Sequence, residues 1–175
     1  TLAELPNGTA ASGRGDFAFT ILRNFVLSSW ALLMWQRLAT SSDEQLAAIA
    51  GKAVKEARYH REHAADWVVR LGDGTEESTR RMASALDRLW PYCAELFDAD
   101  ETDREAAAQG LGPAWSALEE AWRADVAAVL DEAGMALPAA SAFRSDGKRG
   151  RHSEHMGRLL AEMQYLHRAF PGGVW

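Results

Sequence analysis

The residues best suited to chemistry lie in one predicted helix, beginning at Glu56. In bundles that bind two iron atoms through carboxylates, a Glu and a His three residues later project inward from one helix, and a facing helix repeats the pair. Here Tyr59 follows Glu56 by three residues, and a weaker copy, Glu162 followed by Tyr165, occurs near the C-terminus. Tyrosine lacks the neutral imidazole and is a poor Fe(II) ligand beside carboxylates. The pattern therefore predicts degenerate di-iron positions at Glu56 and Tyr59.

Two histidines offer an alternative metal site on the same helix. His60 and His63 follow Glu56 by four and seven residues, so the three side chains share one face and are weak candidate ligands. The other interpretation is a buried, hydrogen-bonded or ion-paired network with nearby lysine and arginine side chains, because buried charges must be paired. We favour the network, since no complete Glu-x-x-His pattern occurs in the chain.

A basic loop is the second candidate site. Residues 135–151 are predicted to form a mobile loop that carries Lys148, Arg149 and Arg151. These side chains are weak candidates for contact with a partner subunit, or with an anion such as the phosphates of an acyl-CoA. The alternative is that the loop is simply solvated, as exposed charges usually are.

Composition and the remaining motifs exclude several classes of protein. The net charge of −6 makes the chain a poor candidate for binding nucleic acid or an anionic membrane. Cys93 is the only cysteine, so an internal disulfide and a multi-cysteine metal site are both excluded, and we expect a buried, structural thiol. No glycine-rich phosphate loop, nucleophile elbow or Ser-His-acid pattern is present.

The elements that would position these residues are all predicted helices. A flexible lead-in over residues 1–15 precedes them, with Asp16 as the cap of the first helix. Pro91 should kink or split the third helix. The expected helices cover 17–39, 43–71, 75–96, a short segment within 98–109, a long helix from residue 113, and 153–169. The chain is thus expected to be one all-α bundle over residues 1–175. The charge-free stretch 24–36 is too short to span a bilayer.

Hydrophobic spacing predicts which helix faces meet the core. On the second helix, a stripe with alternating steps of three and four residues is expected to face inward. Its members are Leu46, Ile49, Ala53, Glu56, His60, His63 and Trp67. On the long helix after residue 113, the predicted core face carries Trp115, Leu118, Trp122, Val126 and Val129.

Long stretches of the sequence resemble a known family. The matching segments are Pro6 to Gly8, Asp16 to Ala18, Lys52 to His60, Arg70 to Thr75, Leu89 to Trp90, Ala94 to Asp100, Glu154 to His155, Leu160 to Leu166 and Trp175. Together they resemble the C subunit of ring-1,2-phenylacetyl-CoA epoxidase over nearly the whole chain.

The resemblance implies a ferritin-like bundle in a cytoplasmic, multicomponent monooxygenase of phenylacetate catabolism. In that family the A subunit holds the di-iron centre and binds phenylacetyl-CoA, the C subunit is its non-catalytic structural partner, and a reductase subunit delivers electrons. The resemblance thus implies no cofactor and no catalytic residue in this chain. The alternative function is a metal-dependent oxygenase that binds its own iron through Glu56, His60 and His63.

The sequence departs from the family pattern near its N-terminus. The family has a further pair of helices before its Pro-Asn-Gly turn, so the resemblance implies a bundle that is incomplete at the N-terminus. The family sequence also runs almost directly from that turn into its Asp-Phe-Ala segment, whereas residues 9–15 intervene in this chain. We therefore expect exposed apolar faces on the first two helices, which favour oligomerisation.

Overall fold

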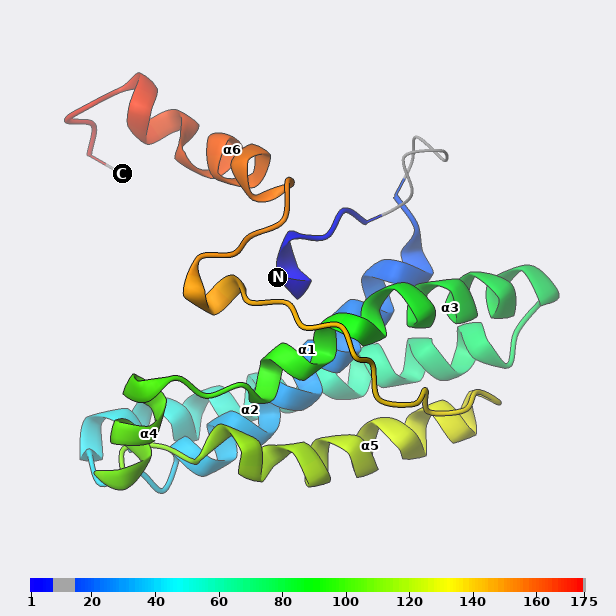
Figure 1. Cartoon of the computed structure of the whole chain (residues 1–175), viewed down its shortest axis with the longest axis horizontal. Coiled ribbons are helices and arrows are strands. Elements are labelled where there is room, and N and C mark those ends of the chain that lie inside the picture. Colours follow the sequence, from blue (N-terminus) through cyan, green and yellow to red (C-terminus); the bar gives the residue numbers. More distant parts are fainter. Residues whose placement is uncertain (8–14, 175) are drawn as a thin grey trace.

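The fold is an all-α bundle in which consecutive long helices run antiparallel (Figure 1). A computed structural model describes residues 1–7 and 15–174, and within them it contains no strand, only an isolated bridge between Asp146 and Arg151. The α-helices are α1 (Phe17–Leu38), α2 (Glu44–Gly72), α3 (Glu76–Leu89), α4 (Glu101–Ala108), α5 (Glu119–Glu132) and α6 (Met156–Ala169). Short 3-10 helices are η1 (Leu2–Glu4), η2 (Trp90–Phe97), η3 (Trp115–Leu118) and η4 (Gly147–Arg149).

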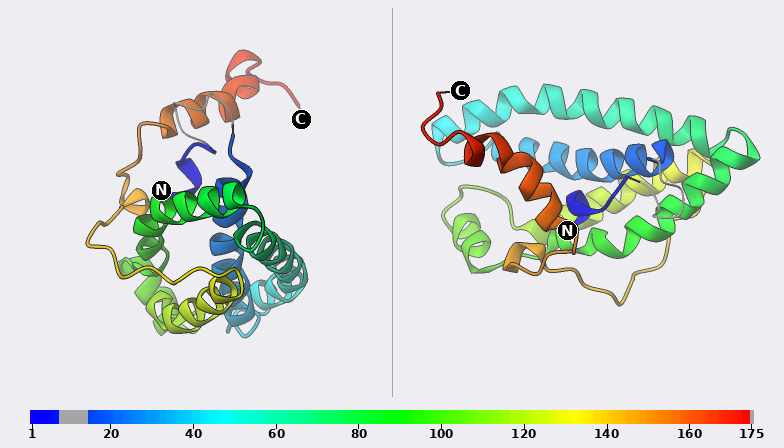
Figure 2. Two further views of the ribbon diagram at one scale, coloured as in Figure 1. Left: turned by 90° about the vertical axis from the view of Figure 1, so that its right-hand side faces the viewer. Right: turned by 90° about the horizontal axis from the view of Figure 1, so that it is seen from above.

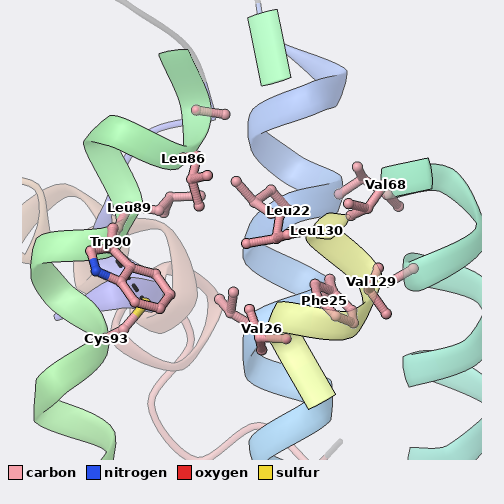
Figure 3. Close-up of a cluster of buried hydrophobic side chains, with 14 of the residues drawn as sticks. Leu22, Phe25, Val26, Val68, Leu86, Leu89, Trp90, Cys93, Val129 and Leu130 are labelled. Carbon is pink, nitrogen blue, oxygen red and sulfur yellow. Dashed lines mark hydrogen bonds between the residues drawn. The ribbon is translucent and has the colours of Figure 1, made fainter. Parts of the chain in front are cut away.

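The first helix, α1, is the centre of the core. The Asp16 carboxylate accepts a hydrogen bond from the Ala18 amide at 2.9 Å, which confirms the predicted cap. Leu22, Phe25 and Val26 are fully buried, and Figure 3 shows side chains of α2, α3, η2 and α5 gathered around them. Because α2, α3 and α5 all pack against α1, that helix sets the position of the others.

Trp122 fixes α5 to this centre. Its indole Nε1 donates a hydrogen bond to the Val26 carbonyl at 3.0 Å, and its ring stacks on Trp90 with centroids 5.7 Å apart. The core face predicted after residue 113 is confirmed at Leu118 of η3 and at Val126 and Val129 of α5, which are buried with Trp122. The Trp122 side chain therefore connects α5 to both α1 and η2.

The predicted core face of α2 is wrong. Ile49, Glu56 and His60 of the expected inward stripe are exposed. The buried positions instead lie roughly a quarter turn away around the helix, at 100° per residue. They are Ala50, Ala57, Ala64, Ala65, Val68 and Gly72. Small side chains let the backbones of α1 and α2 approach closely, so α2 packs through alanines that contribute little to a hydrophobicity pattern.

Most other local predictions agree with the structure. Pro91 ends α3, and the chain continues as the 3-10 helix η2. The short acidic helix is α4, and it is followed by Gly110 at φ +72°, a left-handed conformation that glycine adopts readily. The predicted flexible lead-in is wrong at its start, where residues 2–4 form η1 and Leu2 is buried. Most of the intervening stretch 9–15 and the terminal Trp175 lie outside the described residues.

The two ends of the chain lie on the same side of the bundle. Figure 2 shows η1 beside the segment that leads into α6, and α6 itself projects from the body. No residue of α6 is buried. The C-terminal helix is thus outside the core that α1 organises.

Among the described residues, one helix meets the length and composition expected of a membrane span. This is α1, with a mean hydropathy of 1.5 over its most apolar window, of which 44% is buried inside the bundle. Its central place in the core accounts for that apolar composition.

Two glycines of α2 give a test of the close helix packing. A Cβ added at Gly72 would lie 2.6 Å from the Ala133 carbonyl oxygen, whereas one added at Gly51 would meet nothing within 4 Å. We expect Gly72→Ala to lower the free energy of unfolding by about 1–3 kcal/mol through overpacking. Gly51→Ala is the matched control and should raise it by about 0.5–1 kcal/mol. Urea unfolding measures both, and equal effects would contradict the packing.

Candidate functional site

The predicted chemical residues of α2 lie together on the protein surface. Glu56 Oε1 is 3.6 Å from His60 Nε2, and their side chains are 79% and 59% exposed. The Tyr59 ring is also exposed and stacks on His63 with centroids 6.0 Å apart. The expected buried network with lysine or arginine is therefore wrong, because the alanine face of α2, and not this stripe, turns toward α1.

This cluster does not fit a di-iron centre. Within residues 1–7 and 15–174, no group of three or more His, Cys, Asp or Glu side chains is placed to hold a metal ion. Glu56 and His60 form only a pair, while the ring of His63 stacks on Tyr59. A carboxylate-bridged site needs several inward-facing ligands from at least two helices, and an exposed Tyr59 supplies none.

A groove between α1 and α2 adjoins the histidines. Its volume is about 400 Å³. The lining residues are Ile21, Asn24, Leu27, Ser28, Ala31, His60, His63 and Ala64. An apolar floor with two imidazoles at its rim suits the side chains of another helix, which would bury the floor and leave polar groups at the edge.

A second groove lies on the other side of Leu27, which lines both. It has a volume of about 250 Å³, and the aromatic side chains of Trp30, Tyr92 and Trp115 contribute to its walls. Lys148 Nζ lies 3.8 Å from the centroid of the Trp115 ring. Such a contact between a cation and an aromatic face is favourable, and it places the basic loop at this groove. The two grooves together form an apolar surface along α1.

Two basic residues of the loop, Lys148 and Arg149, are paired with carboxylates of the same chain. Lys148 contacts Asp103 and lies 3.4 Å from Asp100, the residue that caps α4. Arg149 lies 3.3 Å from Asp98 and bonds Asp146 at 3.1 Å. These carboxylates balance the positive charge locally, and the pairs attach the loop to the bundle.

Arg151 completes the basic set. It forms the backbone bridge to Asp146 and lines a groove of about 450 Å³ together with Arg149. Carboxylates line the same groove, so its charge is mixed. Contact of these residues with an anion or a partner stays a prediction.

Glu4 is an anchoring residue that no sequence pattern indicated. Its carboxylate accepts hydrogen bonds from the Ser153 amide at 2.7 Å and the Ser153 hydroxyl at 2.8 Å, and it lies 2.9 Å from His152 Nδ1. The Glu4 side chain is only 7% exposed. Burial opposes its ionisation, but the hydrogen bonds from His152 and Ser153 outweigh burial and lower the pKa of Glu4 to about 2. Glu4 thereby fixes the start of the C-terminal arm, which is residues 152–174 and includes α6.

Glu95 anchors the loop in the same way. It accepts hydrogen bonds from the Ser145 hydroxyl at 2.5 Å and the Gly147 amide at 2.7 Å. Burial works against ionisation, yet the hydrogen bonds from Ser145 and Thr1 hold the pKa of Glu95 below its usual value. The partners of Glu4 and Glu95 lie about 50 to 150 residues away in sequence, so no local spacing could have identified them.

Cys93 is the buried thiol that the sequence predicts. It lies in η2, and its Sγ–H donates a weak hydrogen bond to the Leu89 carbonyl at 3.6 Å. Burial raises the pKa of Cys93 to about 12, so the thiol is protonated at neutral pH.

Fold and surface define this chain as a ferritin-like helical bundle without a recognisable di-iron ligand set among its described residues. The family model described as phenylacetic acid catabolic protein matches residues 1–175. The chain is also 45% identical over 174 residues to the C subunit of 1,2-phenylacetyl-CoA epoxidase from Escherichia coli (strain K12). That match covers 99% of this chain and 67% of the relative. The chain therefore belongs to the phenylacetic acid catabolic protein family.

The Glu4 anchor predicts a pH-dependent attachment of the arm. Folding lowers the pKa of Glu4 from 4.5 to about 2. The stabilisation that ionised Glu4 gives to this attachment is therefore complete above pH 4.5 and is lost as the pH falls toward 2. Glu4→Gln should remove this contribution at neutral pH and raise the hydrogen-exchange rate of the Ser153 amide several-fold. The matched control is Glu154→Gln, whose side chain is 87% exposed. An unchanged Ser153 amide in Glu4→Gln would contradict the anchor.

Proposed function

We propose that this chain is a non-catalytic structural subunit of a multicomponent phenylacetyl-CoA epoxidase in aerobic phenylacetate degradation. It packs against the di-iron catalytic subunit of the same complex and stabilises it. The observation that carries this proposal is the exposed Tyr59 in the position where a di-iron helix has its histidine. The 45% identity to the C subunit of an epoxidase supports the same assignment.

The apolar surface along α1 supports a role in assembly. The two grooves that share Leu27 present aromatic and aliphatic side chains that another bundle can cover. A rigid bundle seated there would hold the helices of the catalytic subunit in register. Metal-site geometry tolerates little displacement, so this support favours oxygen chemistry that takes place wholly in the partner.

The other elements of the proposal concern its setting. The assembly also includes a reductase subunit that supplies electrons, and it works in the cytoplasm. In this chain we assign no catalytic residue and no cofactor.

One observation favours the alternative of a metal-dependent oxygenase. Glu56 and His60 lie 3.6 Å apart on the surface, so rotation of the His63 ring toward them and a fourth ligand from elsewhere would complete a site. The two proposals differ in where iron binds, and metal analysis distinguishes them.

Removal of the three candidate ligands is the first test of this function. In the complex co-expressed with the catalytic subunit, replacement of Glu56, His60 and His63 together by alanine should leave the iron content and the epoxidation turnover per assembled complex within twofold of wild type. Metal analysis and size-exclusion chromatography of the lone chain and of the complex provide the controls. Loss of iron from a normally assembled complex would favour the alternative.

Trp67 gives a second test, directed at assembly. Its half-buried ring lies edge-on to exposed Phe17, with centroids 5.3 Å apart, at one end of the exposed stripe of α2. We expect Trp67→Ala to weaken binding of the catalytic subunit at least tenfold, about 1.4 kcal/mol, since tryptophan is often an interface anchor. Turnover per assembled complex should stay normal. Glu62→Ala, on the far side of α2, is the control, and unaltered affinity in Trp67→Ala would argue against this role.

A further inference from the structure

The C-terminal helix α6 carries an apolar seam that nothing in the described chain covers. Apolar residues occur at steps of three, four, three and four along one face. They are Met156, Leu159, Met163, Leu166 and Phe170. Met163 and Leu166 are 72% and 54% exposed, and Leu160 beside the seam is exposed too. This is the heptad spacing by which one helix packs its side chains between those of another.

The base of α6 is held in place before any partner arrives. Glu4 binds Ser153 and His152, three and four residues before the helix, through a nearly buried carboxylate. The neighbouring loop is held by Glu95 and by the ion pairs of Lys148 and Arg149. Figure 1 shows α6 projecting from this anchored base, away from α1 and α5. An anchored arm loses less conformational freedom on binding than a free one, so the seam is pre-organised.

The exposed area of the seam limits the kind of partner that it can bind. Within α6, Arg158 and Arg168 against Glu162 leave a formal charge of only +1, so charge does not select the partner. Six side chains of this size expose a few hundred Å² at most, whereas a stable interface buries about 800 Å² on each partner. Pairing of α6 with a second copy through this seam alone is too small, so its partner must be held by other contacts as well.

We propose that α6 is a docking arm whose seam packs against an α-helix of another subunit of the epoxidase assembly, one with apolar residues at heptad spacing. This inference rests on the proposed function, because the assembly supplies the additional contacts. The arm then adds a small contact area to a larger interface between the two subunits. Glu4 acts as its positioning residue.

A photo-crosslinking experiment on the assembled complex tests where the seam packs. A benzophenone side chain is introduced at Met163, and at Ala161 on the opposite face of α6 as the control. After irradiation, the Met163 position should crosslink to a helix of another subunit, identified by mass spectrometry, at a yield at least fivefold above Ala161. Crosslinks confined to this chain, to a second copy, or absent from an intact complex would each overturn the proposal.

Charge substitutions provide an independent test. Leu166→Glu should weaken assembly at least tenfold, while Ala161→Glu adds the same charge on the opposite face and should leave it unchanged. The unfolding midpoint of each lone chain shows that the bundle is intact. If wild type fails to bind any epoxidase subunit, the proposed function itself fails. If wild type assembles and Leu166→Glu assembles equally well, only the docking arm fails.

Discussion

Burial of one face of α1 is the constraint on which the rest of the structure depends. Leu22, Phe25 and Val26 are fully enclosed, and removing such side chains from water contributes about 1.5–3 kcal/mol each. Three separate helices pack against this face, and Trp122 adds a directional hydrogen bond to the Val26 carbonyl. The arrangement leaves the opposite edge of α1 with two apolar grooves. The same helix thus organises the core and supplies the surface proposed for assembly.

The close contact of α2 with α1 determines which chemistry α2 can present. A face of alanines turned inward places Glu56, Tyr59 and His60 toward solvent. In a di-iron bundle the corresponding carboxylates and imidazoles converge in the interior, where their charges are balanced by metal. Here they need no such balance, since water surrounds them. A tyrosine at position 59 and exposure of its neighbours are therefore consistent with each other.

Local rules predicted much of the fold. Asp16 caps α1, Pro91 ends α3, and the spacing of Leu118, Trp122 and Val126 identified a buried face. These features depend on residues within a few positions of one another. The face of α2 was not predictable in that way, because two stripes with helical spacing compete along it. The stripe with larger side chains dominated the pattern, while close packing selected the alanines.

The parts of the candidate site that depend on contacts between distant segments of the chain could not be predicted from the sequence. The fixed spacing of a di-iron helix is what allowed the sequence to predict degenerate di-iron positions at Glu56 and Tyr59. Glu4 and Glu95 were not predicted, because their hydrogen-bond partners are distant in the chain and their own neighbourhoods carry no motif. The basic residues were noticed, but the carboxylates that pair with Lys148 and Arg149 come from another part of the chain. The spacing of residues within a helix predicts which side chains share a face. It does not predict which residues of other segments contact that face.

The burial of Cys93 has a consequence for oxidative stress. A thiol reacts with peroxide and with alkylating agents as its thiolate, and a pKa of about 12 leaves roughly one molecule in 10⁵ in that form at pH 7. The only cysteine of the chain is therefore chemically silent while the bundle is folded. In the proposed oxygen-activating complex, a reactive thiol here would be an oxidisable group beside Trp90 and Phe97, where a sulfinic acid would open the core.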